Sequence, residues 1–244
     1  MPLPCPVMPA GIFIFMQAEG GSAMTRMELV RRYGLFTGGL FLEGLGIALA
    51  KESGLGVSPV SSIANVVSCD ITRISLGTWL FIWNCLLLIM QLVILGRRFR
   101  AVQLLQLPIS VLFGCFTDIG LALAHRIPLG SYAGQSAMLL AGILFLALGI
   151  ELTVIANVVL NSGEAFVKAV SDRTGFAFGN VKVATDISFV TVAVVLSLIL
   201  FHGSIVGTRE GTIISACLTG VAVRLWARLI ERPVEAVFAL RPIR

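Results

Sequence analysis

The chain has 244 residues, of which 57% are apolar and 13% are charged, against about 25% charged in a soluble domain. A mean hydropathy of +0.96 is too high for a surface that faces water all round. The net charge of +5 does not indicate nucleic-acid binding, because the basic residues flank long apolar runs and form no stripe on a polar domain. These properties exclude a soluble globular protein and predict an all-α integral membrane protein.

The first 32 residues are expected to form a cytosolic, flexible N-terminal segment. Gly11 to Met16 is too short for the apolar core of a signal peptide, and no basic region precedes it. A start codon further along, at Met24 or Met27, is a second explanation for these residues.

Apolar runs recur along the rest of the chain at the length that a spanning helix needs, about 20 residues for a 30 Å hydrocarbon core. We predict six spans: Leu35–Ala50, Ile74–Gly96, Leu104–Ala124, Tyr132–Leu160, Val183–Phe201 and Gly211–Ile230. The last run is the weakest, since Arg224 and Arg228 sit in its final turns and must reach toward the interface. Five spans are therefore the alternative.

Lysines and arginines in the short connections predict the orientation. With six spans, the arginine-rich regions fall on one side: the N-terminal flank, the link after the second span, the loop with Lys168 and Arg173, and the C-terminal end. The opposite side carries sparse or mixed charge. We therefore expect both termini in the cytosol and the protein in the cytoplasmic membrane, with the lipid bilayer as its partner and no nucleic acid.

A weak internal repeat appears when the chain is compared with itself. Gly46-Ile47 falls on Gly149-Ile150 at an offset of 103, and Cys115-Phe116-Thr117 falls on Cys217-Leu218-Thr219 at 102. This predicts two halves, residues 33–126 and 127–230, followed by a basic tail at 231–244. Three spans in each half would place the halves in inverted orientation, as in many secondary transporters.

Between the first and second span of each half, residues that break and restart helices interrupt the apolar pattern. They are Gly54, Gly56, Ser58 and Pro59 in the first half, and Asn161, Ser162, Gly163 and Glu164 in the second. We expect short, re-entrant-like helices here, whose free N–H groups could bind an anionic group. The alternative is an ordinary loop and a surface amphipathic helix.

Four acids lie within the predicted spans, where a charged side chain costs about 2.5–3.5 kcal/mol at the helix centre. They are Glu43, Asp118, Glu151 and Asp186. Glu43 and Glu151 lie mid-span in the first helix of each half, which makes them the candidates for proton coupling, with Asp118, Asn84 and Asn157 as further candidates for the same pathway. Alternatively these acids are structural, and Asp186 reaches the cytosolic face beside Lys182.

No enzyme signature appears. The two histidines lie far apart, the five cysteines form no CxxC pair, and there is no phosphate loop or HExxH motif. We expect no enzymatic activity, no cofactor and no metal site.

Two motifs resemble a bacterial membrane protein family. Gly44-Leu45-Gly46-Ile47-Ala48-Leu49 followed by Gly54-Leu55-Gly56-Val57-Ser58-Pro59 resembles the signature of the YczE/YyaS/YitT-type proteins. The resemblance extends over roughly Tyr33 to Leu229, but Val60 and Ser61 stand where that family tends to have an aromatic and then an acidic residue. It implies an integral membrane protein, with some members assigned to small-molecule export.

The expected function is therefore secondary transport of a small organic solute, and the family resemblance suggests export as its direction. The alternative is a membrane accessory protein that scaffolds a partner enzyme or transporter. A water-accessible cavity at the mid-span acids would favour transport, and a packed interior with satisfied acids would favour the scaffold.

Overall fold

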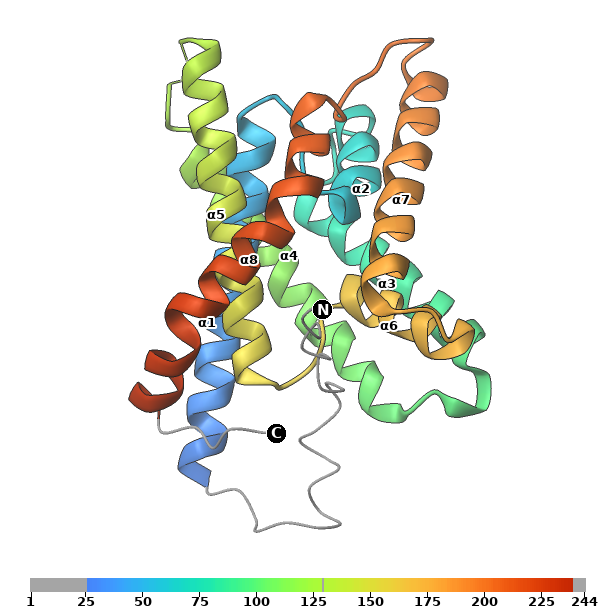
Figure 1. The fold of residues 1–244 in the computed structure, drawn as a ribbon. Helices are drawn as coiled ribbons and strands as arrows, with labels where there is room; N and C mark the ends of the chain where they lie inside the picture. Colours follow the sequence, from blue (N-terminus) through green and yellow to red (C-terminus); the bar gives the residue numbers. More distant parts are fainter. Residues whose placement is uncertain (1–25, 129, 239–244) are drawn as a thin grey trace, which may run out of the picture.

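The computed structural model describes residues 26–128 and 130–238, and these residues form helices and connections without a strand. Eight α-helices follow one another in these ranges (Figure 1). They are α1 (Arg26–Glu52), α2 (Pro59–Asp70), α3 (Leu76–Leu95), α4 (Gln106–Ala124), α5 (Tyr132–Ala156), α6 (Ser162–Thr174), α7 (Phe178–Leu200) and α8 (Glu210–Val237). Two short 3₁₀ helices, η2 (Gly96–Arg98) and η3 (Ala101–Leu105), join α3 to α4.

The prediction of an all-α protein with six spans is confirmed for the described residues. α1, α3, α4, α5, α7 and α8 are long and apolar enough to cross a membrane, whereas α2 and α6 are short. Several bounds differ from the predicted ones. α1 already begins at Arg26 and α8 continues to Val237, so residues 26–32 and 231–237 are helical where we expected terminal segments; residues 1–25 lie outside the described part. α5 ends early because Asn157 takes a left-handed backbone conformation, with φ 48°.

α1 and α5 form the most extensive helix pair of the described residues and run antiparallel in direct contact (Figure 1). Glycines bring the two backbones together: a Cβ on Gly46 would lie 2.7 Å from the Gly142 carbonyl oxygen, and one on Gly39 would lie 2.9 Å from that of Gly149. Small residues that allow such close approach are a common basis of helix association in membranes.

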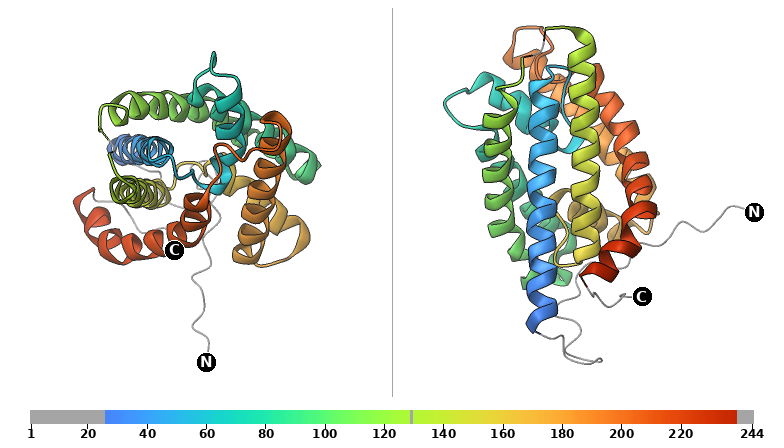
Figure 2. Two further views of the ribbon diagram at one scale, coloured as in Figure 1. Left: turned by 90° about the horizontal axis from the view of Figure 1, so that it is seen from above. Right: turned by 90° about the vertical axis from the view of Figure 1, so that its left-hand side faces the viewer.

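The short helices α2 and α6 connect the two halves of the chain. α2 packs against α7 of the other half, and α6 packs against α3. Viewed from above, α1 and α5 lie on one side and α7 on the other (Figure 2). Each half thus contributes one short helix that lies against spans of both halves.

The pairing of the last two spans differs between the halves. α3 packs along α4, with Gly77 and Gly114 in close contact, whereas α7 and α8 have no comparable contact within the described residues. α8 packs instead on α5 and touches α2, and it diverges from α7 (Figure 1). α7 and α8 are therefore not packed against each other in the way that α3 and α4 are.

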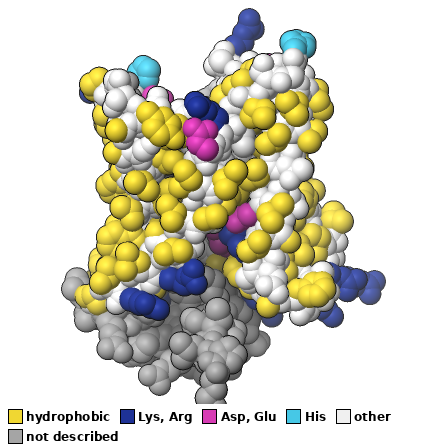
Figure 3. Space-filling model, turned by 45° about the horizontal axis from the view of Figure 1, so that its top comes forward, with side chains coloured by type: hydrophobic (Ala, Val, Ile, Leu, Met, Phe, Trp, Pro, Cys, Tyr) yellow, Lys and Arg dark blue, Asp and Glu magenta, His cyan; other side chains and the backbone are white. Residues whose placement is uncertain are grey.

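The start of α1 and the end of α8 lie at the same end of the bundle (Figure 1). The Arg31 guanidinium donates to the Phe238 carbonyl oxygen at 3.2 Å, which joins the two helices there. Apolar side chains cover much of the outer face (Figure 3), and several large ones are strongly exposed: Val93, Ile199 and Ile213. Such a surface suits lipid contact.

Candidate functional site

Glu43 is the acid at the centre of the candidate site. It lies on α1 and is only 2% exposed. The amide of Asn161 donates to Oε2 at 2.9 Å, and the Thr153 hydroxyl on α5 lies 3.0 Å from Oε1 and shares its single proton between this oxygen and the Ile150 carbonyl oxygen at 2.8 Å. Both carboxylate oxygens therefore have a donor, which reduces the cost of placing this group inside a membrane protein.

Asn161 links Glu43 to the beginning of α6. It is the N-cap residue of α6, and its Oδ1 accepts a hydrogen bond from the Ser162 N–H at 2.7 Å. Its amide nitrogen is thereby directed at Glu43. One side chain thus fixes the first turn of α6 and satisfies a buried carboxylate on α1.

The polar contacts continue from α6 to α3 and α4. Gln91 and Gln106 exchange two side-chain hydrogen bonds, at 3.1 and 3.2 Å, and Gln91 also donates to the Ser162 carbonyl oxygen at 3.3 Å. The Ser110 and Ser162 hydroxyls lie 3.5 Å apart. We call this group the Glu43 network: Glu43, Thr153, Asn161, Ser162, Gln91, Gln106 and Ser110. It joins five helices at the N-terminus of α6.

A charged group lies beside the network on α6 and α7. The Lys182 ammonium pairs with Asp186 at 2.7 Å, and the partly buried Glu164 interacts electrostatically with both of these residues and with Glu43. Burial raises the pKa of Glu164 and Asp186 raises it further, while the positive charge of Lys182 opposes this shift. Figure 3 shows acidic and basic side chains together in the otherwise apolar middle of one face.

The other mid-span candidates lie on α3, α4 and α5 or at the end of α5. Asp118 accepts a hydrogen bond from the Gly77 N–H at 2.8 Å and so satisfies the N-terminus of α3. Glu151 is buried on α5. Asn84 is buried on α3, and its Nδ2 has no hydrogen-bond partner among the described residues. Asn157 forms the C-cap of α5.

The predicted helix break between α1 and α2, from Gly54 to Pro59, also ends one helix and starts another. Gly54 and Gly56 have φ of +72° and +124°, which favours glycine, and Ser58 is the N-cap of α2 with Pro59 at the first helical position. The Ser58 hydroxyl does not cap the helix backbone; it lies 2.9 Å from the Ser61 hydroxyl. The second-half motif has a similar form, with Asn161 as N-cap and Ser162, Gly163 and Glu164 in the first turn of α6.

Sequence reasoning missed four members of the network: Gln91, Gln106, Ser110 and Thr153. Gln91 and Gln106 carried the available signal, because an uncharged polar side chain in or next to a spanning run needs a hydrogen-bonding partner. The sequence could not show that the two glutamines bond each other or that Gln91 also donates to the first turn of α6.

A small cavity of about 40 Å³ lies next to the network, between the start of α4, α6 and the link after α5. Gln103, Gln106, Lys168 and Asp172 are its polar lining residues. Its size suits a few water molecules and is too small for an organic solute. Among the described residues, no three His, Cys, Asp or Glu side chains gather in a way that could hold a metal ion.

A family model described as a family of unknown function, DUF6198, matches residues 30–228. The chain belongs to this family. The match covers all six spans except the first residues of α1 and the last turns of α8, and it includes every residue of the Glu43 network. Comparisons with curated proteins and with solved structures give no match.

Proposed function

We propose that this protein is a secondary transporter of a small organic solute in the cytoplasmic membrane, and that Glu43 couples transport to proton movement. The observation that carries the proposal is the bond from Asn161 to Glu43. A buried acid on a central span is held by the N-cap of a short, separately packed helix. Ionisable groups inside a membrane protein commonly mark an ion or substrate pathway.

The geometry supports a simple coupling step. When Glu43 is ionised, the hydrogen bonds from Asn161 and Thr153 are charge-assisted and therefore strong. A proton on Oε2 would remove the negative charge and leave a weaker acceptor opposite the Asn161 amide, which would weaken the attachment of α6 to α1. α6 would then move against α3 and α4, where Ser162 contacts Gln91 and Ser110.

We also propose that the two halves form an inverted repeat. Two pairs of glycines at an offset of 103 support this proposal: Gly39 with Gly142, and Gly46 with Gly149. Across the antiparallel contact, Gly39 approaches Gly149 and Gly46 approaches Gly142, which is the pattern of a two-fold axis between α1 and α5. In other transporters, substrate sites lie near such an axis at the midplane.

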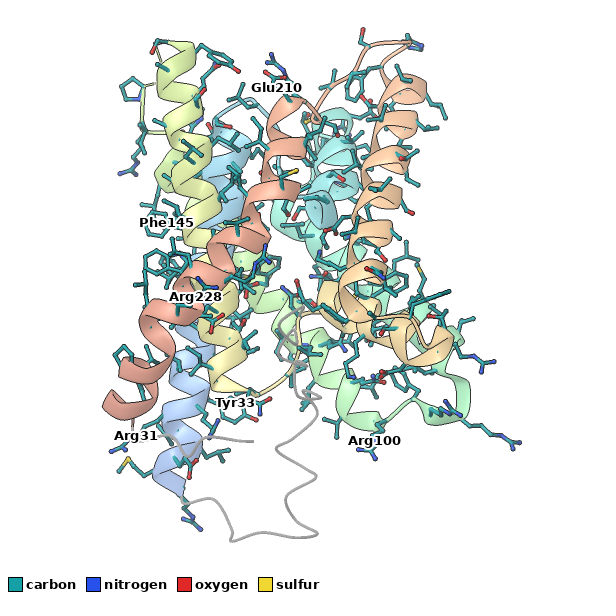
Figure 4. The ribbon with its side chains drawn as sticks, in the orientation of Figure 1. Arg31, Tyr33, Arg100, Phe145, Glu210 and Arg228 are labelled. Atoms are coloured by element: carbon teal, nitrogen blue, oxygen red, sulfur yellow. The ribbon has the colours of Figure 1, made fainter. Side chains whose placement is uncertain are left out.

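The proposed orientation places both termini in the cytosol. Its support is the shared end of α1 and α8 together with the arginines there; Figure 4 shows Arg31 and Arg100 at this end and Glu210 at the other. A reporter that is active only in the periplasm should stay inactive when fused after Arg244. Strong activity of this fusion would refute the orientation.

Proton movement in reconstituted vesicles tests the coupling role. Candidate metabolites are added to vesicles that contain a pH-sensitive dye, and a solute that drives proton flux identifies the substrate. Glu43→Gln keeps the side-chain volume but leaves a neutral group opposite Asn161, as in the protonated state, so the variant should fold and lose the proton flux. Asp118→Asn, at a mid-span acid whose carboxylate accepts from the Gly77 N–H, is the matched control. Proton flux that persists in Glu43→Gln would refute the role of Glu43.

A second function, in which the protein scaffolds a partner in the membrane, is favoured by the packing around the acids. Glu43 and Asp118 are hydrogen-bonded, Asp186 is paired with Lys182, and the cavity beside the network is small. If no metabolite moves protons through the unmodified protein, this function is preferred. The resemblance to the YczE/YyaS/YitT-type proteins, some of which are assigned to export, supports transport. We propose no enzymatic step for either function.

A further inference from the structure

A row of hydroxyl groups follows the buried face of α8 and the residues before it. Its members are Thr212, Ser215 and Thr219, which are spaced so that they share one side of α8, and Thr208, two residues before the helix begins. Thr208, Thr212 and Ser215 are each at least nine-tenths buried. The four hydroxyl oxygens have no hydrogen-bond partner among the described residues. Hydroxyls in spanning helices commonly donate to their own backbone, so a whole row without partners is unusual.

Three of the four positions have polar counterparts in the first half, and all three counterparts are bonded; Ser215 corresponds to Phe113. At the offset of 102, Thr208, Thr212 and Thr219 correspond to Gln106, Ser110 and Thr117 on α4. Gln106 bonds to Gln91, Ser110 contacts the Ser162 hydroxyl, and Thr117 donates to a carbonyl oxygen of its own helix.

The second half lacks the side chains that close the first row. At the same offset, the position of Gln91 on α3 corresponds to Ala193 on α7. When the N-caps Asn161 and Ser58 are matched, Ser162 corresponds to Pro59, which has no hydroxyl. The hydroxyl row of α8 therefore lacks the side-chain partners that the corresponding residues of α4 have.

One buried polar side chain of α2 lies beside the start of the row. Asn65 on α2 donates through Nδ2 to the Gly207 carbonyl oxygen at 2.7 Å, and its buried Oδ1 has no partner. Gly56 allows the closest approach, since a Cβ there would collide with the Thr212 hydroxyl. The row begins near Glu210, at the end of the bundle opposite Arg31 (Figure 4), and its neighbour α7 does not pack along α8.

We propose that the hydroxyl row of α8, together with Asn65, lines the access path for water and small uncharged hydrogen-bonding solutes from the end of the bundle that carries Glu210. This inference rests on the proposed function and names the substrate class. Hydroxyl and amide groups can both donate and accept, so they replace the water around a neutral polar solute. A charged solute would need a counter-charge, which these groups do not provide.

Thiol labelling from the Glu210 side tests the path. Ser215→Cys replaces an oxygen by a sulfur and should fold; Thr212→Cys is the second variant. Both are made in a chain whose own cysteines, including Cys217, are replaced. The matched control retains Cys217 alone, which is exposed on another face of α8. The probe is a charged, membrane-impermeant methanethiosulfonate, which reacts with the thiolate and therefore needs water at the sulfur.

The thiol at position 215 should react at least about tenfold faster than Cys217, because the thiolate and the charged probe meet only in water, and Cys217 lies on the exposed outer face of a spanning helix. Equal or slower reaction in both variants would overturn the proposal. Reaction only from the arginine-rich end would overturn its direction. Either result leaves the proton flux through Glu43 to be judged by its own assay, so the two proposals can fail separately.

Discussion

The glycine contact between α1 and α5 leads to the most quantitative prediction. In Gly46→Ala, the new Cβ would lie 2.5 Å from the Leu146 nitrogen and 2.7 Å from the Gly142 carbonyl oxygen. Both are backbone atoms that no rotamer change can move. Because non-bonded heavy atoms prefer about 3.5–4.0 Å, the helices must separate by about 1 Å. Overpacking of this kind costs about 1–3 kcal/mol.

The control for this prediction is Gly38→Ala on the same helix. A Cβ on Gly38 meets nothing within 4 Å, so the change should be neutral or stabilise the helix by up to about 1 kcal/mol. Thermal unfolding in detergent, followed by the loss of the monodisperse peak on size exclusion, compares the two variants. Gly46→Ala should unfold several degrees lower than Gly38→Ala. Equal midpoints would refute the close antiparallel contact.

Two further predictions concern acids outside the coupling bond. Asp118→Ala removes the acceptor for the Gly77 N–H and should lower the free energy of unfolding by about 1 kcal/mol. Asp118→Asn keeps an acceptor oxygen and should be close to wild type in the same unfolding assay. Equal losses of stability in both variants would contradict the capping role. The raised pKa of Glu164 means that its folded-state charge is disfavoured, so its contribution to stability is present at low pH and falls as pH rises above about 4. Glu164→Gln should therefore flatten this part of the pH–stability profile and stabilise the protein at neutral pH, and an unchanged slope would contradict the assignment.

The membrane class and the six spans could be predicted from the sequence, because both depend on local hydropathy. The 23 residues of α7 are an apolar helix whatever packs against them. The helix breaks were also local signals: Gly54, Gly56 and Pro59 have few alternatives to a turn followed by a helix start. The interruption before α6 was predicted at Asn161, which is its N-cap.

The composition of the site was not predictable in this way, because it depends on contacts between distant residues. Glu43 and Asn161 lie 118 positions apart, and nothing near either residue indicates the other. The pairing of Glu43 with Glu151, which similar depth along their helices suggests, stays a prediction, and depth gives no indication that Glu164 on α6 interacts electrostatically with Glu43. Depth along a helix does not determine which face of the helix a side chain occupies.

The central claim is that the protonation of Glu43 controls the position of α6, and a distance measurement between spin labels tests it most directly. One label replaces Tyr33 on α1 and the other Arg173 in the last turn of α6; both are exposed, and the native cysteines are removed. The unmodified Glu43 protein should show a shift in this distance between mildly alkaline and mildly acidic buffer. Glu43→Gln should show the acidic distance in both buffers, because Gln cannot restore the charge-assisted bond to Asn161. An identical distance in both buffers with Glu43 present, or the same shift in Glu43→Gln, would contradict the account.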